Sequence, residues 1–275
     1  HERFEEPISL ADEDAAHRLQ CMVGPFILRR LKGDVLKDLP EKNESVVYTG
    51  MDDEQRKLYD AVASNLVKTL RHQMPQEFAT QRFAILAELT KLRQICCDPA
   101  ILYDNYEGVS GKLEAALDLI RTAVEGGHKV LLFSQFTSML SVIGKRLEED
   151  GLAYHTLVGS TPKEQRARLV NSFQTDDVPV FLISLKAGGV GLNLTAADVV
   201  IHYDPWWNLA AQNQATDRAH RIGQKRSVSV MRLIAQGTIE EKIVALQESK
   251  RELAESILGG QATASTSLSK EDILA

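Results

Sequence analysis

The 275-residue chain has only three cysteines, and two of them, Cys96 and Cys97, are adjacent. Sparse cysteines in an odd number argue against a disulfide framework, and an adjacent pair lacks zinc-ligand spacing. No apolar run approaches the ~18 residues that a membrane span needs, and the polar start HERFEEPISL is no signal peptide. A disulfide scaffold, a zinc module and a transmembrane protein are therefore excluded, and a composition that is 44% hydrophobic is that of an ordinary globular protein.

An excess of positive charge is also missing, because the net charge is -6. This balance neither indicates nor excludes nucleic-acid binding, which depends on where the charges lie. The basic residues do form two local clusters: Arg29, Arg30, Lys32 and Lys37, and then Arg218, Arg221, Lys225 and Arg226. Each cluster is either a solvated face or a binding surface.

A phosphate-binding loop of the G-x-x-x-x-G-K-[ST] type is absent. Gly111-Lys112 is followed by Leu113 instead of Ser or Thr, and no buried strand precedes the acidic run at 12–14. The glycines at 188–191 do not form a dinucleotide fingerprint either, since Leu194 stands where a glycine is required. A dinucleotide-dependent enzyme is thus disfavoured.

What is present is a regular alternation of helical and strand patterns. Helices are predicted at 112–125, 137–150, 162–174, 208–219 and 238–258, and strands at 129–134, 153–158, 179–184, 198–203 and 227–234. The strands are continuous apolar runs, which is typical of a parallel sheet covered by helices on both faces. The predicted fold class is α/β.

The first part of the chain has a different character. Residues 1–25 are polar and helix-leaning, and 26–50 form a predicted connector that includes a short β-type run. Residues 51–110 are predicted to be a projecting helical hairpin and a linker, with Asp52 at its N-terminal cap. Thr161, followed by Pro162 and Glu164, and Thr238 with Glu241 mark two further helix starts, and 259–275 is predicted to be a flexible tail.

Binding residues in open parallel sheets come from loops at the carboxyl ends of the strands. Ser134 and Gln135 follow the first strand, where their polar groups either bind a phosphate or cap the next helix. The glycine-rich run at 184–198 lets the backbone approach a ligand closely, or forms an ordinary tight turn.

The segment DPWWNLAAQNQATDRAHRIGQ at 204–224 is the most informative. Gln214, Arg218 and Arg221 stand at i, i+4 and i+7, which places them on one face of a helix. A solvated helix often carries such charges, but two arginines in register also suit a polyphosphate, because the guanidinium fork matches phosphate oxygens. The tryptophan pair before this helix either packs in the interior or stacks on a base.

KVLLFSQF, GSTPKEQR, SLKAGGVGLNL, DPWWN and QATDRAHRIGQ occur in this order along the chain. Together they resemble the second-lobe motifs of superfamily-two helicases, in the form typical of Swi/Snf-type chromatin-remodelling ATPases, and look most like bacterial members. PFILRRLKGDVLKDLPEK and LTKLRQICCDPAIL resemble the connector and helical protrusion of the same family. The resemblance covers roughly residues 4–258.

The resemblance implies a role for each matching residue. Arg218 and Arg221 correspond to arginine fingers that reach the γ-phosphate of ATP, positioned with the help of Gln214, and Gly191 and Asn193 correspond to contacts with the nucleotide sugar. The residues implied to grip a DNA strand are Ser134, Gln135, Arg166, Ser184, Lys186 and Trp207. The family usually has Asn-Pro after this tryptophan, whereas this chain has Asn208-Leu209.

Family members have two RecA-like lobes, with ATP in the cleft between them and DNA lying across both. The resemblance implies that 111–237 is the second RecA-like lobe, that 238–258 is a brace-like helix, and that 1–25 is the trailing edge of a missing first lobe. That first lobe would hold the phosphate loop and the Mg²⁺ ligands. We also expect Arg218 and Arg221 to stand clear of the packed interior, at the carboxyl edge of the sheet.

The expected partners are double-stranded DNA and the first ATPase lobe, without a membrane, and the expected cofactor is ATP with Mg²⁺. The expected activity is that of a double-stranded DNA translocase that shows no useful ATP hydrolysis as this chain alone. The location implied is the cytoplasm and nucleoid if the protein is bacterial, or the nucleus if it is eukaryotic. A non-catalytic DNA-binding or docking module is the alternative.

Overall fold

The structure is a computed structural model of residues 1–275, and it describes residues 13–23, 39–72, 82–187 and 192–259. The chain divides into two units. The larger unit, Asp38–Glu241, contains the sheet and both of its helical layers. The smaller unit contains helix α2 (Glu13–Val23) and helix α11 (Ile239–Gly259) from Lys242 onward.

The larger unit contains a six-stranded sheet in which every pair of neighbouring strands is parallel. Its order is β1-β6-β5-β2-β4-β3. The strands are β1 (Lys42–Thr49), β2 (Val130–Ser134), β3 (Tyr154–Leu157), β4 (Val180–Ser184), β5 (Val199–His202) and β6 (Val228–Ala235). The three central apolar strands β2, β4 and β5 are buried along their whole length, as their continuous apolar runs predict.

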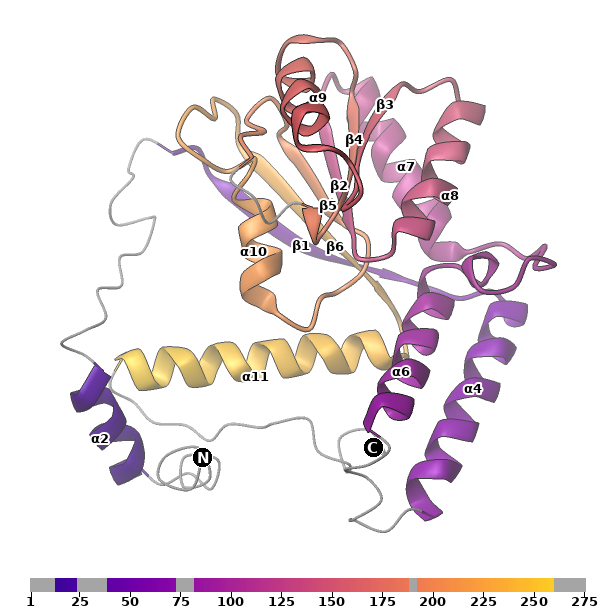
Figure 1. The fold of residues 1–275 in the computed structure, drawn as a ribbon, viewed down its shortest axis with the longest axis vertical. Coiled ribbons are helices and arrows are strands. Elements are labelled where there is room, and N and C mark those ends of the chain that lie inside the picture. The colour runs from indigo at the N-terminus through magenta and orange to yellow at the C-terminus, as the bar shows by residue number, and fades with distance from the viewer. Residues whose placement is uncertain (1–12, 24–38, 73–81, 188–191, 260–275) are drawn as a thin grey trace. The chain divides into compact units, whose positions relative to one another are not determined.

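Helices cover both faces of this sheet (Figure 1). On one face, α7 (Gly111–Glu125) and α8 (Thr137–Glu149) pack on side chains such as Leu132 of β2. On the other face, α9 (Lys163–Thr175) and α10 (Leu209–Thr216) pack on side chains such as Leu131. Successive residues of one strand therefore supply two separate cores. The predicted fold class, an α/β parallel sheet with helices on both faces, is confirmed.

The edge strand β1 contains the short β-type run that was predicted within residues 26–50, and it begins a few residues earlier. Its eight residues pair in register with β6, from Lys42 beside Val228 to Thr49 beside Ala235. Most of β1 is exposed, and its first half is polar, so it lacks the apolar run that identified the other strands. The local sequence did not show its partner in the sheet, which lies 186 positions further along the chain at Lys42.

The predicted helical hairpin is present as α4 (Asp53–His72) and α6 (Arg82–Cys97), which pack against each other and are followed by the short 3-10 helix η2 (Pro99–Ile101). Asp52 caps α4, because its Oδ1 accepts the N–H of Gln55 at 2.6 Å. The Gln55 side chain does not complete a capping box, and donates instead to the carbonyl of Ile95 on α6 at 2.7 Å. The Gln55 side chain therefore links α4 to α6.

The two other predicted caps have different outcomes. Thr238 caps α11 as expected, since its Oγ1 accepts the N–H of Glu240 at 3.2 Å. Thr161 does not cap α9, which begins at Lys163 after Pro162, and its Oγ1 accepts the N–H of Val158 at 3.1 Å instead. Its hydroxyl is engaged by the loop before the helix, so the predicted capping box is wrong.

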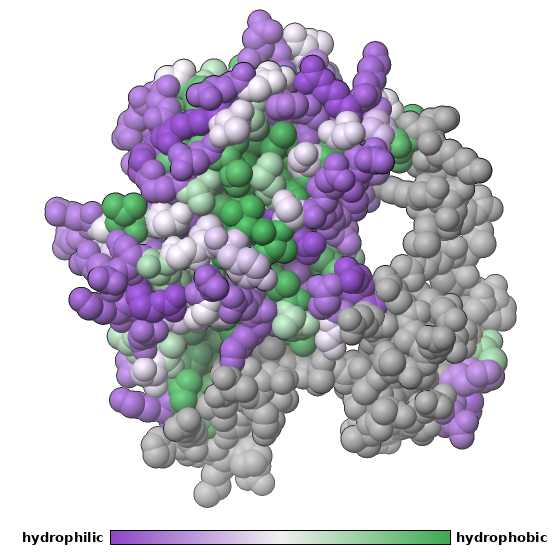
Figure 2. Space-filling model, turned by 180° about the vertical axis from the view of Figure 1, so that it is seen from behind, coloured by the Kyte–Doolittle hydropathy of each residue, from purple (hydrophilic) through white to green (hydrophobic). Residues whose placement is uncertain are grey.

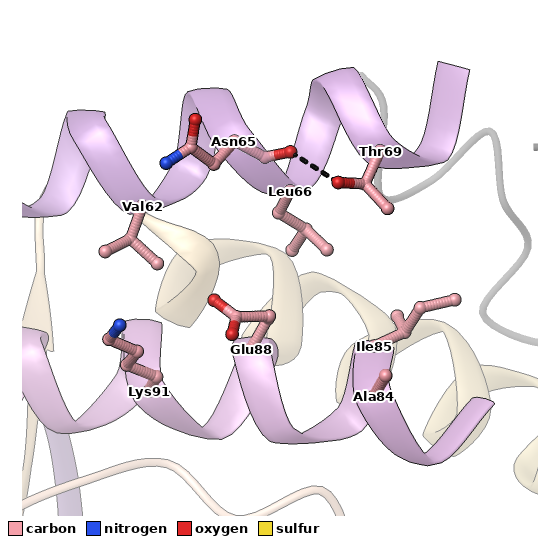
Figure 3. A pocket seen from close by; sticks show the side chains of 8 residues that line it. All are labelled: Val62, Asn65, Leu66, Thr69, Ala84, Ile85, Glu88 and Lys91. Atoms are coloured by element: carbon pink, nitrogen blue, oxygen red, sulfur yellow. Dashed lines mark hydrogen bonds between the residues drawn. The ribbon is translucent and has the colours of Figure 1, made fainter. Parts of the chain in front are cut away.

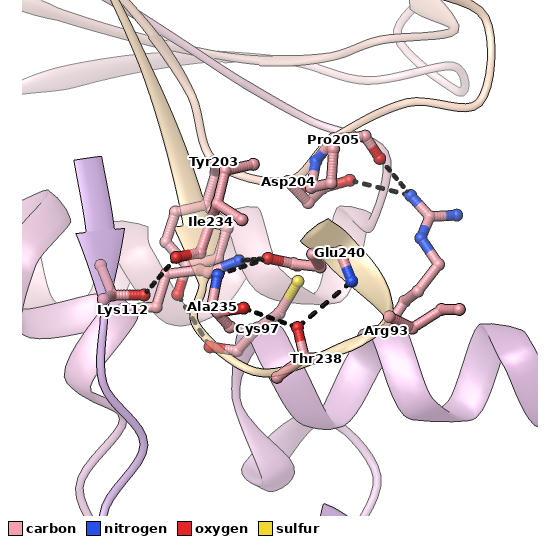
Figure 4. A network of polar contacts seen from close by, with 12 residues as sticks. Arg93, Cys97, Lys112, Tyr203, Asp204, Pro205, Ile234, Ala235, Thr238 and Glu240 are labelled. Carbon is pink, nitrogen blue, oxygen red and sulfur yellow. Dashed lines mark hydrogen bonds and ion pairs between the residues drawn. The ribbon is translucent and has the colours of Figure 1, made fainter. Parts of the chain in front are cut away.

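A buried ion pair joins α7 to the start of α11 (Figure 4). Lys112 and Glu240 are 1% and 0% exposed, and Glu240 Oε2 also accepts the N–H of Ala235 at 2.8 Å. The lysine Nζ lies 5.8 Å from the centre of the Tyr203 ring. The Gly111-Lys112 dipeptide thus has a structural role, which agrees with its rejection as a phosphate loop.

The surface of the described residues is mainly hydrophilic, with an apolar strip in the middle of the face in Figure 2. Phe83 and Leu86 on α6 are the large apolar side chains that stand exposed on the helical hairpin, among the residues described there. Of the helices that the structure describes, none combines the length and the apolar character needed to cross a membrane.

Substituting Lys112 with Met should lower the free energy of unfolding by about 3–5 kcal/mol, because it leaves the buried carboxylate of Glu240 without its cation. Adding Glu240→Gln, which keeps an acceptor for Ala235 N–H, should restore most of the loss. Urea unfolding of the two variants and the parent checks this. If Lys112→Met alone were as stable as the parent, Lys112 would not be compensating the buried charge of Glu240.

Candidate functional site

The carboxyl edge of the sheet is organised around the buried carboxylate of Asp204, which follows β5. Its Oδ1 accepts the Ser134 hydroxyl at 2.5 Å and the Gln135 N–H at 3.2 Å, both from the loop after β2. Ser134 Oγ in turn accepts the N–H of Phe136 at 3.1 Å. One side chain therefore fixes the loops of two neighbouring strands in a single arrangement.

Arg93 of α6 reaches this carboxylate from the helical hairpin (Figure 4). It is 3% exposed, its Nη2 lies 3.7 Å from Asp204 Oδ2, and it donates to the carbonyl of Pro205. Its guanidinium carbon lies 5.5 Å from the ring centre of Trp207 and 5.7 Å from that of Phe136. These distances suit cation–π contacts with both rings.

Burial raises the pKa of Asp204 to about 6, even though Arg93 and the Ser134 hydrogen bond lower it. Burial lowers the pKa of the nearby His202 to about 3, with the charge of Arg232 acting in the same direction. His202 lies at the end of β5, and its Nε2 is 2.8 Å from Thr216 Oγ1 on α10. The histidine is therefore held neutral inside the fold at neutral pH.

Trp207 is half-buried, and the turn that carries it is well defined. Asn208 caps α10, since its Oδ1 accepts the N–H groups of Ala210 at 3.0 Å and Ala211 at 3.4 Å. Leu209 takes the first helical position, where proline is favoured because its fixed backbone angle is already helical. Leucine also accepts that conformation, so the departure from Asn-Pro leaves the helix start intact.

Two predicted DNA contacts are corrected, because the side chains of Ser134 and Ser184 are buried, at 0% and 3% exposed. Ser134 bonds Asp204, and Ser184 Oγ accepts the N–H of Ala187 at 3.3 Å. Their hydroxyl groups hold loops together and are not presented to a ligand. Gln135 is half-buried and Lys186 is exposed, so these two remain candidates at this edge.

Arg166 lies on the face of the sheet covered by α9, and much of its guanidinium serves the preceding loop. Nε donates to the carbonyl of Thr161 at 2.7 Å and Nη2 to that of Gly159 at 2.6 Å. Asn193 is exposed, and its carbonyl accepts the Gln174 side chain at 2.6 Å. Gly191 lies outside the described residues.

The predicted helical face of Gln214, Arg218 and Arg221 is not formed. Helix α10 ends at Thr216, and residues 217–224 continue as turns, so only exposed Gln214 lies on the helix. Because α10 runs antiparallel to the strands, it carries these turns towards the amino edge of the sheet. The expectation that both arginines lie at the carboxyl edge is therefore wrong.

Contacts with residues that precede the strands fix this turn segment, which we call the arginine turn (217–224). His220 Nε2 lies 2.8 Å from the carbonyl of Pro40, just before β1, and the Arg218 carbonyl accepts the N–H of Leu194 at 3.0 Å. These contacts hold the backbone of the arginine turn from two sides at the amino edge.

Gln224 closes the arginine turn and was missed in the sequence, although it ends the same motif. It is 8% exposed, and Nε2 donates to the carbonyls of Ala197 at 2.8 Å and Ala219 at 3.1 Å. Its Oε1 accepts the N–H groups of Lys225 and Arg226 at 2.8 and 2.9 Å. An amide that donates and accepts in this way is a structural clamp, a role that motif spacing does not reveal.

The two arginines differ in exposure. Arg218 is 7% exposed, so the expectation that it stands clear of the packed interior is wrong, whereas Arg221 is exposed as expected. Burial lowers the pKa of Arg218, and the positive charge of Arg221 lowers it further, so the two charges lie within electrostatic reach of one another. The exposed guanidinium of Arg221, on a fixed backbone, offers planar donors that match phosphate oxygens.

A metal site and a pocket were the other possible kinds of functional site in the described residues. Among the residues described, no group of three or more His, Cys, Asp or Glu side chains is arranged to hold a metal ion. A pocket of about 320 Å³ lies between α4 and α6, lined by residues that include Leu66, Ile85 and Glu88 (Figure 3). None of the predicted site residues lines it.

Comparisons with known proteins agree on one relationship. The model of the helicase conserved C-terminal domain matches residues 111–223, and that of the SNF2-related domain matches residues 1–101. The chain is 33% identical to the Sulfolobus solfataricus SWI2/SNF2 ATPase C-terminal domain, with a TM-score of 0.68 that covers 85% of this chain and 96% of that one. The same enzyme's core in complex with dsDNA is 36% identical, with a TM-score of 0.68, over 95% of this chain and 56% of that one.

Relatives in other organisms are much longer. An uncharacterized ATP-dependent helicase of Mycoplasma pneumoniae is 40% identical over 95% of this chain, and the Danio rerio chromodomain-helicase-DNA-binding protein 1-like is 40% identical over 87%. The matched parts are 25% and 24% of those proteins, so the chain spans about a quarter of their length.

Acid should destabilise the fold through His202, whose pKa is about 6.5 when unfolded and about 3 when folded. A lowered pKa stabilises the fold above pH 6.5, and this contribution is lost as pH falls towards 3, by up to about 1.4 kcal/mol per unit. Urea unfolding at pH 7.5 and pH 5 should show a drop about 2 kcal/mol larger in the parent than in His202→Gln. Equal drops would show that this histidine does not set the difference.

Proposed function

Because the chain belongs to the SWI2/SNF2 ATPase family, as a helicase C-terminal lobe, we propose that it is the second motor lobe of an ATP-driven translocase on double-stranded DNA. Family membership rests on the comparisons and does not depend on where the arginines lie. The fixed arginine turn, with two interacting guanidinium groups, is the observation in this structure that supports the motor role.

Phosphoryl transfer asks a protein mainly to position groups and to stabilise charge. In this proposal, Arg221, which is exposed, extends to the γ-phosphate, and Arg218 supports it from its partly desolvated position. Gln214, exposed one turn earlier, takes part in positioning, and Asn193 and Gly191 lie along the nucleotide sugar. Clamping by Gln224 and His220 means that little ordering of the backbone is needed when ATP arrives.

ATP with Mg²⁺ would be held chiefly by the first lobe, which supplies the phosphate loop and the metal ligands. The part of this chain in that division is the arginine turn, which offers cations to the phosphates. ATP bound between two lobes would draw them together, and each cycle would change the grip on DNA.

DNA contacts are proposed for Gln135, Lys186 and Trp207 at the carboxyl edge, with Arg166 nearby on α9. The dsDNA complex of the Sulfolobus relative supports a DNA-binding role for lobes of this type. DNA would then meet the carboxyl edge while the nucleotide meets the arginine turn at the amino edge. Helix α11, fixed at its start by Glu240 and continuing into the other unit, would serve as the brace.

The proposed protein partner is the first lobe of the same protein, and residues 1–25 would be the trailing edge of that lobe. The bacterial relatives favour a cytoplasmic protein. A non-catalytic DNA-docking lobe remains the second candidate, because the chain has no phosphate loop of its own.

In the intact protein that includes the first lobe, Arg221→Ala should lower DNA-stimulated ATP turnover by roughly 10³-fold or more, since arginine fingers act on the transition state. DNA affinity should stay near the parent value, because the arginine turn lies away from the DNA-binding edge. Steady-state ATPase assays and DNA titrations measure both. The matched control is Arg168→Ala, another exposed arginine, on α9; near-normal turnover in Arg221→Ala would exclude the finger role.

Filter-binding titrations of this chain alone should show weak binding to duplex DNA that declines steeply with salt, and ATP binding too weak to measure. The salt dependence follows from release of counterions by phosphate contacts. Tight ATP binding would contradict the requirement for a first lobe. Absence of any salt-sensitive DNA binding would contradict the DNA role of the carboxyl edge.

A further inference from the structure

Arg93 connects the helical hairpin to both loops at the carboxyl edge, although it lies in the segment that resembles the helical protrusion and in none of the five second-lobe motifs. It lies in α6, more than a hundred residues before Asp204 and Trp207 in the chain. At 3% exposure it cannot be a surface contact for DNA. Its side chain instead contacts groups in the two loops at the carboxyl edge, and the positions of these groups determine which side chains that edge exposes.

Three kinds of contact converge on this one guanidinium. Its Nη2 lies 3.7 Å from Asp204 Oδ2, which makes an ion pair, and the same nitrogen donates a hydrogen bond to the Pro205 carbonyl. Its guanidinium carbon also lies 5.5 Å from the ring centre of Trp207 and 5.7 Å from that of Phe136. Flat guanidinium groups pack on rings in a way that the compact ammonium of lysine does not reproduce.

We infer that Arg93 is a positioning residue for DNA engagement: it fixes the ring of Trp207 relative to the Gln135 loop, an inference that rests on the DNA-binding role proposed above. Asp204 holds the Gln135 backbone, and Arg93 holds both Asp204 and the tryptophan. The spacing between the two DNA-contact groups is thereby set by a residue of the hairpin. The hairpin thus takes part in the motor's grip on DNA without touching it.

The chain has only two tryptophans, so Trp206→Phe leaves Trp207 as the only tryptophan to report by fluorescence. In that background, Arg93→Lys keeps a cation beside Asp204 but removes the planar group near the two rings. It should keep near-parental urea stability, yet make Trp207 more accessible to acrylamide and weaken duplex DNA binding about tenfold. If Arg93 served only as a structural cation, the lysine variant would match its parent in urea stability, acrylamide quenching and DNA affinity.

Arg93→Met combined with Asp204→Asn serves as a second variant that leaves no unpaired buried carboxylate. It should reproduce the quenching and DNA-binding changes of Arg93→Lys, whereas Asp204→Asn alone should show smaller ones. Arg56→Met is the matched control, because Arg56 on α4 also donates to two backbone carbonyls and lies over a ring, that of Tyr59. It should leave Trp207 quenching and DNA affinity unchanged.

The outcomes separate the two proposals. If the Trp206→Phe parent binds duplex DNA with a change in Trp207 fluorescence, but the Arg93 variants match it, the positioning role is wrong and the DNA-binding role stands. If the Arg93 variants alter acrylamide quenching but the parent itself shows no salt-sensitive DNA binding, the DNA-binding role fails and Arg93 only orders a loop. Equal effects in Arg56→Met would show that loss of any arginine with carbonyl and ring contacts suffices, and would overturn the inference.

Discussion

In a sheet whose strands are all parallel, each helix between two strands has to carry the chain back from the carboxyl edge to the amino edge. Helix α10 does so between β5 and β6, and this constraint separates two groups of polar residues that are neighbours in sequence. Trp207 stays at the carboxyl edge, whereas Arg221 moves to the amino edge. In the proposed function, this separation lets one short motif face DNA at one edge and the nucleotide at the other.

Each edge is then held by a buried polar side chain with several partners. At the carboxyl edge this is Asp204, which joins the loops after β2 and β5 and is compensated by Arg93. At the amino edge it is Gln224, whose amide uses both its donor and acceptor groups. Buried groups of this kind are costly unless satisfied, so these loops have one strongly preferred arrangement. The residues proposed to contact ligands therefore lie on loops that internal contacts already hold in place.

Sequence patterns predicted the elements well and the side-chain partners poorly. The apolar runs located β2 to β6 within a residue or two, and Asp52 and Thr238 were identified as caps from neighbouring residues alone. Ser134 and Ser184 were misassigned, because a serine after a strand looks the same whether it faces solvent or a buried partner. The partner of Ser134 is Asp204, which lies 70 residues further along the chain and therefore outside any local sequence pattern.

The sequence by itself determined the order of helices and strands, the parallel α/β class and the family, since these depend on local periodicity and on motif wording. Only the tertiary structure decided that β1 joins the sheet, that Arg218 and Arg221 leave the helix and the carboxyl edge, and that Arg93 lies beside Asp204 and Trp207. The physical reason is that burial and charge pairing are set by segments brought together in space, which exert no influence on the local sequence pattern.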